Sequence, residues 1–342
     1  MSIFHLLLPF LAAAGLTAGL VPLVLRLARQ YRLFDWPDER KNHLAATPRL
    51  GGIAMALAIL FGGIAAMLWG GYPFQGRFIR ALLVGYGPVF AVSLFDDVRP
   101  LPWWVRFAVQ LAGTTAFVLL LGPIQRLNLP LLGTLEVGFW GYPLSIGWLL
   151  LTINAMNFID GVDGLAAGIG AISGAVLMVA VLPTGNVPAV ALAAAVVGCC
   201  VGFLPWNFPP ARVFMGDTGA NLLGFALGAV ALVGAGKNVA LVSLLVPMLA
   251  LAVPIVDAVR VLLRRSWRSG RFFEADREHV HHFLLSLGLG ERRTLFLLYL
   301  VSALSGGLAL FLADAPRWVF AFLGLGALGC FALLFRRGRG RD

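Results

Sequence analysis

Charged residues are scarce in this chain of 342 residues: they make up 12% of it, whereas soluble domains carry about 25%. Hydrophobic residues reach 60%, and the mean hydropathy is +0.89. These values exclude an ordinary soluble globule and a disordered chain. Long unbroken apolar runs stand where a transmembrane barrel would alternate apolar and polar residues. The expected fold class is therefore an all-α polytopic membrane protein.

Cysteine is almost absent as well. Cys199, Cys200 and Cys330 all lie inside apolar runs without metal-ligand spacing, and we expect thiols that pack as small hydrophobes. The first apolar run lacks a preceding basic segment and is long enough to span a bilayer, which predicts a helix rather than a cleavable signal peptide.

Eleven segments approach the length of about 20 apolar residues that a transmembrane helix needs. They lie near 3–25, 51–70, 79–95, 104–122, 142–157, 164–183, 189–205, 219–235, 238–262, 294–312 and 317–335. No linker is long enough to separate two domains, so a single integral membrane domain is expected over residues 1–342.

The basic residues predict the orientation. With the N-terminus outside, 21 of the 26 Lys and Arg residues fall on the inner side. The positive-inside rule then places the N-terminus outside and the C-terminus in the cytoplasm. The same rule explains the net charge of +10, so no nucleic-acid partner is expected. The outer segment 125–139 alternates around a glycine and predicts a short β-hairpin.

Polar chemistry gathers on the predicted inner face. Only Glu136 and Asp314 of the 16 acidic residues fall outside, and four of the five histidines fall inside. An enzyme that acts on a cytoplasmic soluble substrate would show this bias. The rival class, a lipid or solute transporter, needs ionisable groups near the middle of the membrane. None is found, because the most buried acid, Asp257, lies three residues from Arg260 near the inner end.

The inner loops 26–50, 96–106, 154–164, 206–218 and 260–293 are the expected catalytic loops. The first loop packs three acids, two bases and a histidine into Asp35–His43. Pro48 and Gly51-Gly52 predict a rigid turn and a close backbone approach. The loop is interpreted either as a solvated basic segment that fixes topology or as a phosphate-facing loop with Lys41 as a point charge.

Two adjacent acids, Asp96 and Asp97, end an apolar helix directly. They repel each other and face the negative end of the helix dipole. Such a pair invites a compensating cation, such as Mg²⁺ or a substrate proton. The alternative is a solvated pair with a salt bridge to Arg99.

Oxygen donors recur in the next two loops. Asn154, Asn157, Asp160 and Asp163 follow one another every three residues, roughly on one helical face, with no Lys or Arg nearby. They suit a hard cation or a hydrogen-bonding ligand. Asp217 starts the next helix and is interpreted either as an N-cap or as a metal ligand beside N–H groups that bind phosphate.

The last inner loop carries eight arginines and the cluster Asp276-Arg-Glu-His-Val-His-His282. Three histidines in four residues resemble a zinc site, but no cysteine lies nearby. A phosphate-binding arm fits better, with charge from Arg265, Arg268, Arg271 and Arg277. Topology and anionic lipid headgroups are the alternative for the arginines.

Together these loops resemble the polyprenyl-phosphate N-acetylhexosamine-1-phosphate transferase family, in family order and over nearly the whole chain. The matching motifs are Asp35-x-Pro37, Arg40-Lys41-x-His43, Pro48-x-x-Gly51-Gly52, Asp96-Asp97, Asn154-x-x-Asn157-x-x-Asp160-Gly-x-Asp163-Gly-Leu, Phe214-Met-Gly-Asp217-x-Gly219 and Asp276-Arg277-x-His279-x-His281-His282. The His-x-His-His spacing is similar to the branch that uses UDP-N-acetylglucosamine. The phospho-MurNAc-pentapeptide translocase branch has three consecutive histidines.

The resemblance implies a reaction at the cytoplasmic face of the bacterial inner membrane. Undecaprenyl phosphate attacks the β-phosphorus of a UDP-N-acetylamino sugar, giving undecaprenyl-diphospho-sugar and UMP, the first membrane step of cell-envelope glycan synthesis. GlcNAc-1-phosphate is the expected group. Another UDP-N-acetylamino sugar or UDP-MurNAc-pentapeptide is the alternative donor. The implied cofactor is Mg²⁺, with Mn²⁺ as a substitute. Membrane lipid is a further expected partner, and a homodimer is left open.

The resemblance also implies residue roles. Asp217 and Asn157 bind Mg²⁺, and Asp96 is the base or positioner of the lipid phosphate with Asp97 nearby. Asp163 faces the uracil. The other implied substrate-binding residues are Lys41, Asn154, Asp160, Arg265, Arg277, His279, His281 and His282.

Overall fold

The computed structural model of the chain describes residues 3–31, 33–35, 47–69, 75–129, 133–234, 245–268 and 279–313, with seven separate positions from 315 to 329. Most of these residues form helices. The longer ones are α1 (Phe4–Gln30), α2 (Gly51–Trp69), α3 (Gln75–Val98), α4 (Trp103–Leu121), α5 (Gly141–Ile159), α6 (Leu165–Val181), α7 (Val187–Asn207), α8 (Gly216–Gly234), α10 (Ala252–Arg268) and α12 (Glu291–Leu312). The shorter ones are α9 (Leu245–Ala250) and α11 (Val280–Ser286), with 3₁₀ turns η1 (Gly138–Trp140) and η2 (Leu182–Thr184).

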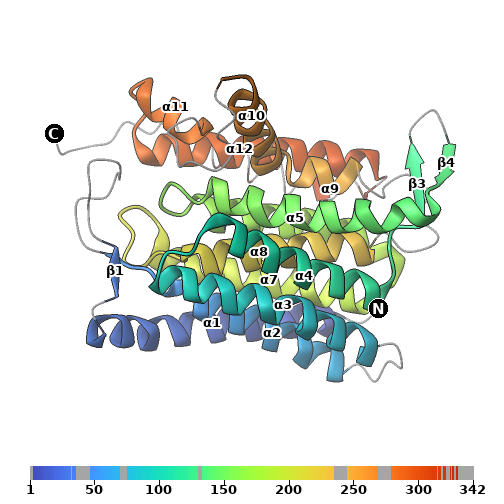
Figure 1. Cartoon of the computed structure of the whole chain (residues 1–342), viewed down its shortest axis with the longest axis horizontal. Helices are drawn as coiled ribbons and strands as arrows, with labels where there is room; N and C mark the ends of the chain where they lie inside the picture. Colours follow the sequence, from blue (N-terminus) through green and yellow to red (C-terminus); the bar gives the residue numbers. More distant parts are fainter. Residues whose placement is uncertain are drawn as a thin grey trace.

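Apart from α10, the long helices lie side by side along the longest axis of the molecule (Figure 1). α7 and α8 are the central helices, since 78% of the apolar window of each is buried, against 28% in α1 and α4. Glycines let neighbouring backbones approach closely. A Cβ at Gly198 of α7 would lie 2.1 Å from the Phe10 carbonyl oxygen of α1, and one at Gly202 would lie 2.5 Å from that of Ala14. Small residues at such crossings are typical of packed membrane helices.

Eight described helices are long and apolar enough to cross a membrane, which confirms an all-α polytopic membrane protein. α2 contributes a shorter apolar segment, Gly51–Ala65. The predicted span 317–335 lies mostly outside the described residues. The number of spans and their orientation stay predictions.

The prediction of one continuous helix over 238–262 is wrong. In its described part the chain is divided at Leu251 into α9 and α10, and α10 turns away from the direction of α9 (Figure 1). Pro254 has no N–H to donate to the carbonyl of Ala250, four residues earlier. The hydroxyl of Ser173 on α6 donates to that carbonyl instead, at 2.6 Å. The break is therefore stabilised by a neighbouring helix.

Two small antiparallel sheets lie at opposite ends of the bundle (Figure 1). β3 (Arg126–Leu129) and β4 (Gly133–Glu136) occupy the segment in which the sequence predicts a hairpin, with Arg126 opposite Glu136. α1 begins at this end of the bundle. β1 (Phe34–Asp35) and β2 (Thr47–Pro48) lie at the other end, where α3 and α5 end and α4, α6 and α8 begin.

The segment after β2 packs directly on the start of α8. The Gly51 N–H donates to the Phe214 carbonyl at 3.0 Å, and the Phe214 N–H donates to the Pro48 carbonyl at 2.8 Å. A Cβ at Gly52 would lie 2.2 Å from the backbone nitrogen of Gly219. The predicted close backbone approach at Gly51-Gly52 is confirmed.

Candidate active site

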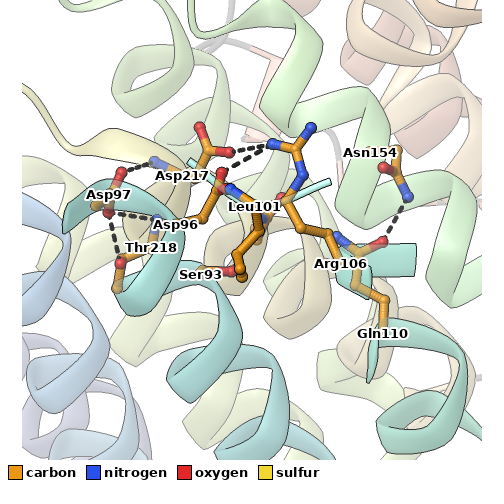
Figure 2. A network of polar contacts seen from close by, with 10 residues as sticks. Ser93, Asp96, Asp97, Leu101, Arg106, Gln110, Asn154, Asp217 and Thr218 are labelled. Atoms are coloured by element: carbon orange, nitrogen blue, oxygen red, sulfur yellow. Dashed lines mark hydrogen bonds and ion pairs between the residues drawn. The ribbon is translucent and has the colours of Figure 1, made fainter. Parts of the chain in front are cut away.

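The first turn of α8 is capped by a carboxylate from another helix. Asp97, in the last turn of α3, accepts the Asp217 N–H at 2.8 Å on Oδ1 and the Thr218 N–H at 3.0 Å on Oδ2 (Figure 2). The Thr218 hydroxyl also donates to Oδ2, at 2.6 Å. The first N–H groups of a helix have no partner within it, so Asp97 satisfies two of them. Asp97 thereby fixes the backbone of Asp217.

Arg106, in the first turn of α4, joins the two other acidic residues of this cluster. Its Nη1 lies 2.8 Å from Asp96 Oδ2 and 2.9 Å from Asp217 Oδ2 (Figure 2). Asp96 Oδ1 accepts the Leu101 N–H at 2.6 Å. The guanidinium is therefore a cation shared by two carboxylates, in a site that stays partly open: the Arg106 side chain is 34% exposed and that of Asp217 is 27% exposed.

The polar residues at the end of α5 divide between a helix and a turn. Asn154 and Asn157 lie in the last two turns of α5, whereas Asp160 and Asp163 follow the end of the helix. The prediction of one helical face for all four is therefore wrong for Asp160 and Asp163, because the chain reverses there to enter α6. The four residues therefore belong to one segment of the site, but they do not share one helical face.

The turn between α5 and α6 is held from two neighbouring helices. Gly164, with φ of +78°, donates its N–H to Asn207 Oδ1 of α7 at 3.0 Å. Its carbonyl accepts the hydroxyl of Tyr299 of α12 at 2.5 Å. Asp163 Oδ2 accepts the N–H of Ala211 at 2.8 Å. The position of Asp163 is thus set by the loop that leads to α8.

Negative charge accumulates around the turn. Burial, together with the carboxylates of Asp217, Asp97 and Asp163, raises the pKa of Asp160 to about 8, while Arg49 acts in the opposite direction. The nearby acids therefore outweigh the nearby base at Asp160. A cation or a bound proton would relieve this repulsion.

The donor set fits Mg²⁺. It consists of carboxylate and amide oxygens, which hard cations prefer. One turn after Asp217 on α8, the buried Oδ1 of Asn221 has no hydrogen-bond partner among the described residues. The described residues hold no group of three His, Cys, Asp or Glu side chains arranged for a metal. Mg²⁺ commonly takes one or two carboxylates and completes its shell with water and substrate phosphates, so such a group is not required.

Three histidines of the last inner loop stand beside the turn. The rings of His279 and His281 stack with centroids 5.6 Å apart, and His282 lies 4.3 Å from His281. His281 is 1% exposed, and neither ring nitrogen has a hydrogen-bond partner among the described residues. Burial, together with His282 and His279, lowers the pKa of His281 to about 3, while Asp257 acts in the opposite direction. His281 is thus a neutral imidazole.

Some predicted substrate-binding residues cannot be placed. Lys41 and Arg277 lie outside the described residues, and Arg265 belongs to α10 without a described side chain.

The structure adds residues that sequence reasoning missed. Arg106 follows Asp96 by ten positions at the start of a helix, and the sequence predicts no role for it beyond its charge on the inner side. The buried Gln110, one turn further on α4, accepts the Asn154 amide at 3.0 Å. Asp257, which the sequence marks only as a buried acid, lies 2.7 Å from His279 Nδ1 through its Oδ2. Nothing in the sequence indicates that Gln110 forms a hydrogen bond with a residue of the site.

Comparison with known proteins agrees with this arrangement. The family model described as glycosyl transferase family 4 matches residues 79–235, which contain α4 to α8 and most of α3. The chain is 34% identical over 306 residues to a Bacillus subtilis (strain 168) protein named "Probable undecaprenyl-phosphate N-acetylglucosaminyl 1-phosphate transferase", with 89% of this chain and 84% of the relative covered.

Two further relatives carry similar names. A "Decaprenyl-phosphate N-acetylglucosaminephosphotransferase" of Mycolicibacterium smegmatis is 33% identical, with 85% of this chain and 79% of the relative covered. An "Undecaprenyl-phosphate alpha-N-acetylglucosaminyl 1-phosphate transferase" of Escherichia coli (strain K12) is 26% identical, with 91% and 86% covered. The chain therefore belongs to glycosyl transferase family 4 and, as the sequence predicts, to the polyprenyl-phosphate N-acetylhexosamine-1-phosphate transferases.

Proposed function

We propose that this chain transfers GlcNAc-1-phosphate from UDP-GlcNAc to undecaprenyl phosphate and releases UMP. The observation that carries the proposal is the Arg106 bridge between Asp96 and Asp217, at the start of α8. This bridge brings a cation and several oxygen ligands together in one partly open site. A reaction between two phosphate groups requires such groups, because their negative charge must be neutralised. The names of the relatives support the sugar and the prenyl phosphate.

The chemistry is a phosphoryl transfer. An oxygen of the lipid phosphate forms a bond to the β-phosphorus of the UDP-sugar. The bond between that phosphorus and the oxygen bridging to the α-phosphate breaks, and this oxygen leaves with UMP. Charge spreads over the oxygens of the transferred group in the transition state, so the site must align the reactants and neutralise charge.

Arg106 and the two adjacent acids divide this work. A phosphate that enters the site competes with Asp96 and Asp217 for the Arg106 guanidinium, which binds phosphate oxygens in the same way as carboxylate oxygens. Asp96 positions the lipid phosphate or accepts its proton. Asp97 uses both its oxygens on the first turn of α8, so it positions Asp217 rather than reacting.

Asp217 and Asn157 are the proposed ligands of Mg²⁺, with Mn²⁺ as a substitute. When bound, the metal supplies charge neutralisation to the phosphates. Asp217 is suited to this role because its backbone is fixed by Asp97 while its carboxylate stays partly exposed.

The remaining predicted residues surround the nucleotide and the phosphates. Asp163 and the neighbouring Asp160 and Asn154 contact the uridine. His281, also a predicted substrate-binding residue, is buried against Gly161 and lies behind the turn. Lys41, Arg265, Arg277, His279 and His282 complete the proposed binding site.

We place the site at the cytoplasmic face of the bacterial inner membrane. Described basic residues gather at this end of the molecule, which supports that side under the positive-inside rule. The product would begin a cell-envelope glycan. A homodimer remains an expectation from the sequence.

The test is turnover by the purified chain in detergent. We expect UMP and a lipid-linked sugar from UDP-GlcNAc with undecaprenyl phosphate and Mg²⁺, and loss of both products in EDTA. UDP-GalNAc and UDP-MurNAc-pentapeptide, run in parallel, distinguish the donor. Asp217→Asn should reduce turnover by about 100-fold or more, as expected for loss of a group that stabilises charge in the transition state.

Arg126→Gln is the matched control, because it removes an exposed ion pair with Glu136 at the opposite end of the molecule. Its turnover should equal that of the unchanged chain. Absence of UMP release with every donor, in protein that remains monodisperse, would contradict the proposed function.

A further inference from the structure

Asp257 is a buried acid outside the cluster described above. It lies in α10 with 2% of its surface exposed. Its Oδ2 lies 2.7 Å from His279 Nδ1, and its Oδ1 accepts the Val280 N–H at 2.7 Å. A carboxylate only accepts hydrogen bonds, so with Asp257 in this form Nδ1 of His279 is the donor. Asp257 therefore fixes both the orientation of the His279 ring and the backbone at the start of α11.

His279 passes this constraint to its neighbours. Its ring lies parallel to that of His281, at an interplanar angle of 4°. It also contacts Phe158, in the last turn of α5, with ring centroids 5.6 Å apart. The ring of His279 is thus held between α10, α11 and the end of α5.

His281 in turn rests on the turn that carries Asp160 and Asp163. A Cβ at Gly161 would lie 2.2 Å from His281 Nε2 and 2.6 Å from Cε1. Only a residue without a side chain leaves room for the imidazole there. The chain of contacts runs from Asp257 through His279 and His281 to Gly161, and so joins α10 to the turn between α5 and α6.

The composition of this chain of contacts argues against a purely structural role. Buried ionic and polar groups often give no more stability than apolar side chains of the same volume. His281 also leaves two buried nitrogens without a partner among the described residues, which costs about 1–3 kcal/mol per group. Polar groups whose burial destabilises the fold, and which contact a segment of an active site, are typical of residues that orient that segment.

We propose that Asp257 is a positioning residue of the candidate active site: through His279 it holds His281 against Gly161 and thereby sets the turn at Asp160–Asp163. This inference rests on the proposed function for its kinetic consequences, but not for its structural ones. Asp257 itself touches no reacting atom.

The test is a double-mutant cycle between Asp257→Asn and His281→Ala. Asparagine keeps an acceptor for the Val280 N–H, but its NH₂ faces Nδ1 of His279 and reverses the ring tautomer. We expect Asp257→Asn to lower kcat/KM by about 10-fold in the unchanged chain, as losses of supporting partners do. In the His281→Ala background the same substitution should change kcat/KM less than twofold, because the path to the turn is already broken.

Ser145→Ala is the matched control. Ser145 is fully buried, and its hydroxyl bonds Ile124 and Gly141 at the other end of α5. The Ser145→Ala variant should lower Tm by an amount similar to that caused by Asp257→Asn, but kcat/KM should not fall. Equal effects of Asp257→Asn in both backgrounds, or no effect in either, would overturn the proposal. A loss of kcat/KM in Ser145→Ala equal to that in Asp257→Asn would also overturn the proposal.

Hydrogen exchange separates this inference from the proposed function. Asp257→Asn should speed amide exchange in peptides that cover residues 159–165, and Ser145→Ala should not. Unchanged exchange there overturns the coupling whether or not the enzyme turns over. If exchange responds while the unchanged chain releases no UMP from any donor, the proposed reaction fails and the coupling stands.

Discussion

Asp96 and Asp97 are adjacent in sequence, yet their carboxylates face different partners. Asp97 turns to the backbone of α8, whereas Asp96 turns to Arg106 and the N–H of Leu101. Adjacent helical residues point about 100° apart, so one acid can cap a neighbouring helix while the other faces the open site. The two residues thus have different tasks. Arg106 is the cation that compensates the negative charge of this pair at the end of α3.

At the same scale, Asp160 predicts a pH dependence of stability. Its pKa is about 8 in the folded chain and about 3.9 in an unfolded one. Between these values the folded state holds a proton that the unfolded state has lost. The contribution of Asp160 to the free energy of unfolding is therefore complete below a pH of about 4. It is lost as the pH rises from there toward 8, by at most about 1.4 kcal/mol per pH unit.

Thermal unfolding in metal-free detergent should test this dependence. The fall in Tm between pH 5 and pH 8 should be smaller for Asp160→Asn, which cannot ionise, than for the unchanged chain. Groups that do not interact with Asp160 contribute equally to both proteins, so the difference reports Asp160 together with the acids coupled to it. Parallel pH profiles would show that Asp160 is ionised in the folded state throughout.

At the scale of elements, the start of α8 depends on three separate segments. Asp97 of α3 caps it, Arg106 of α4 pairs with Asp217, and the segment after β2 packs on it. Gly52→Ala would drive a Cβ to 2.2 Å from Gly219 N and 2.3 Å from the Met215 carbonyl oxygen. Both are backbone atoms that cannot rotate away. We expect a loss of about 1–3 kcal/mol of stability and a fall in turnover as Asp217 shifts.

Gly63→Ala offers a control on the same helix. A Cβ at Gly63 would meet Leu192 at 3.7 Å, an ordinary van der Waals distance. Alanine is favoured over glycine inside a helix by about 0.5–1 kcal/mol, so this variant should keep or gain stability. If Gly52→Ala unfolds at the same temperature as Gly63→Ala and retains turnover, the start of α8 does not depend on this contact.

Elements differ in how far the sequence predicts them. Long apolar runs place most helices within a few residues, because burial in a bilayer acts on every position of a span. The end of α5 was misjudged, since a spacing of three residues suits a helix and a glycine-rich turn equally well. The break between α9 and α10 depends on Pro254, and on a hydroxyl of α6 that no local pattern reveals.

At the scale of the whole molecule, the predicted gathering of polar residues at one end is what the structure shows for Asp96, Asp97, Asp217 and the turn after α5. The individual contacts could not be predicted. Arg106 and Asp217 lie 111 positions apart, and Asp257 reaches His279 from another helix. Such pairs depend on how helices pack, which a single sequence does not report. Lys41 and Arg277 remain untested because they lie outside the described residues.

The side of the membrane on which the site lies can be tested with two reporters at opposite ends of the bundle. Glu136, the last residue of β4, and Ser286, the last residue of α11, are both exposed. Cys199 and Cys200 are fully buried and should not react, and Cys330→Ala removes the remaining thiol. In sealed right-side-out vesicles an impermeant maleimide should label Glu136→Cys at once, and Ser286→Cys only after permeabilisation. The positive-inside rule predicts that the basic residues place the Ser286 end on the cytoplasmic side. Labelling of both positions before permeabilisation, or the reverse order, would contradict the predicted orientation and place the proposed site away from cytoplasmic UDP-sugars.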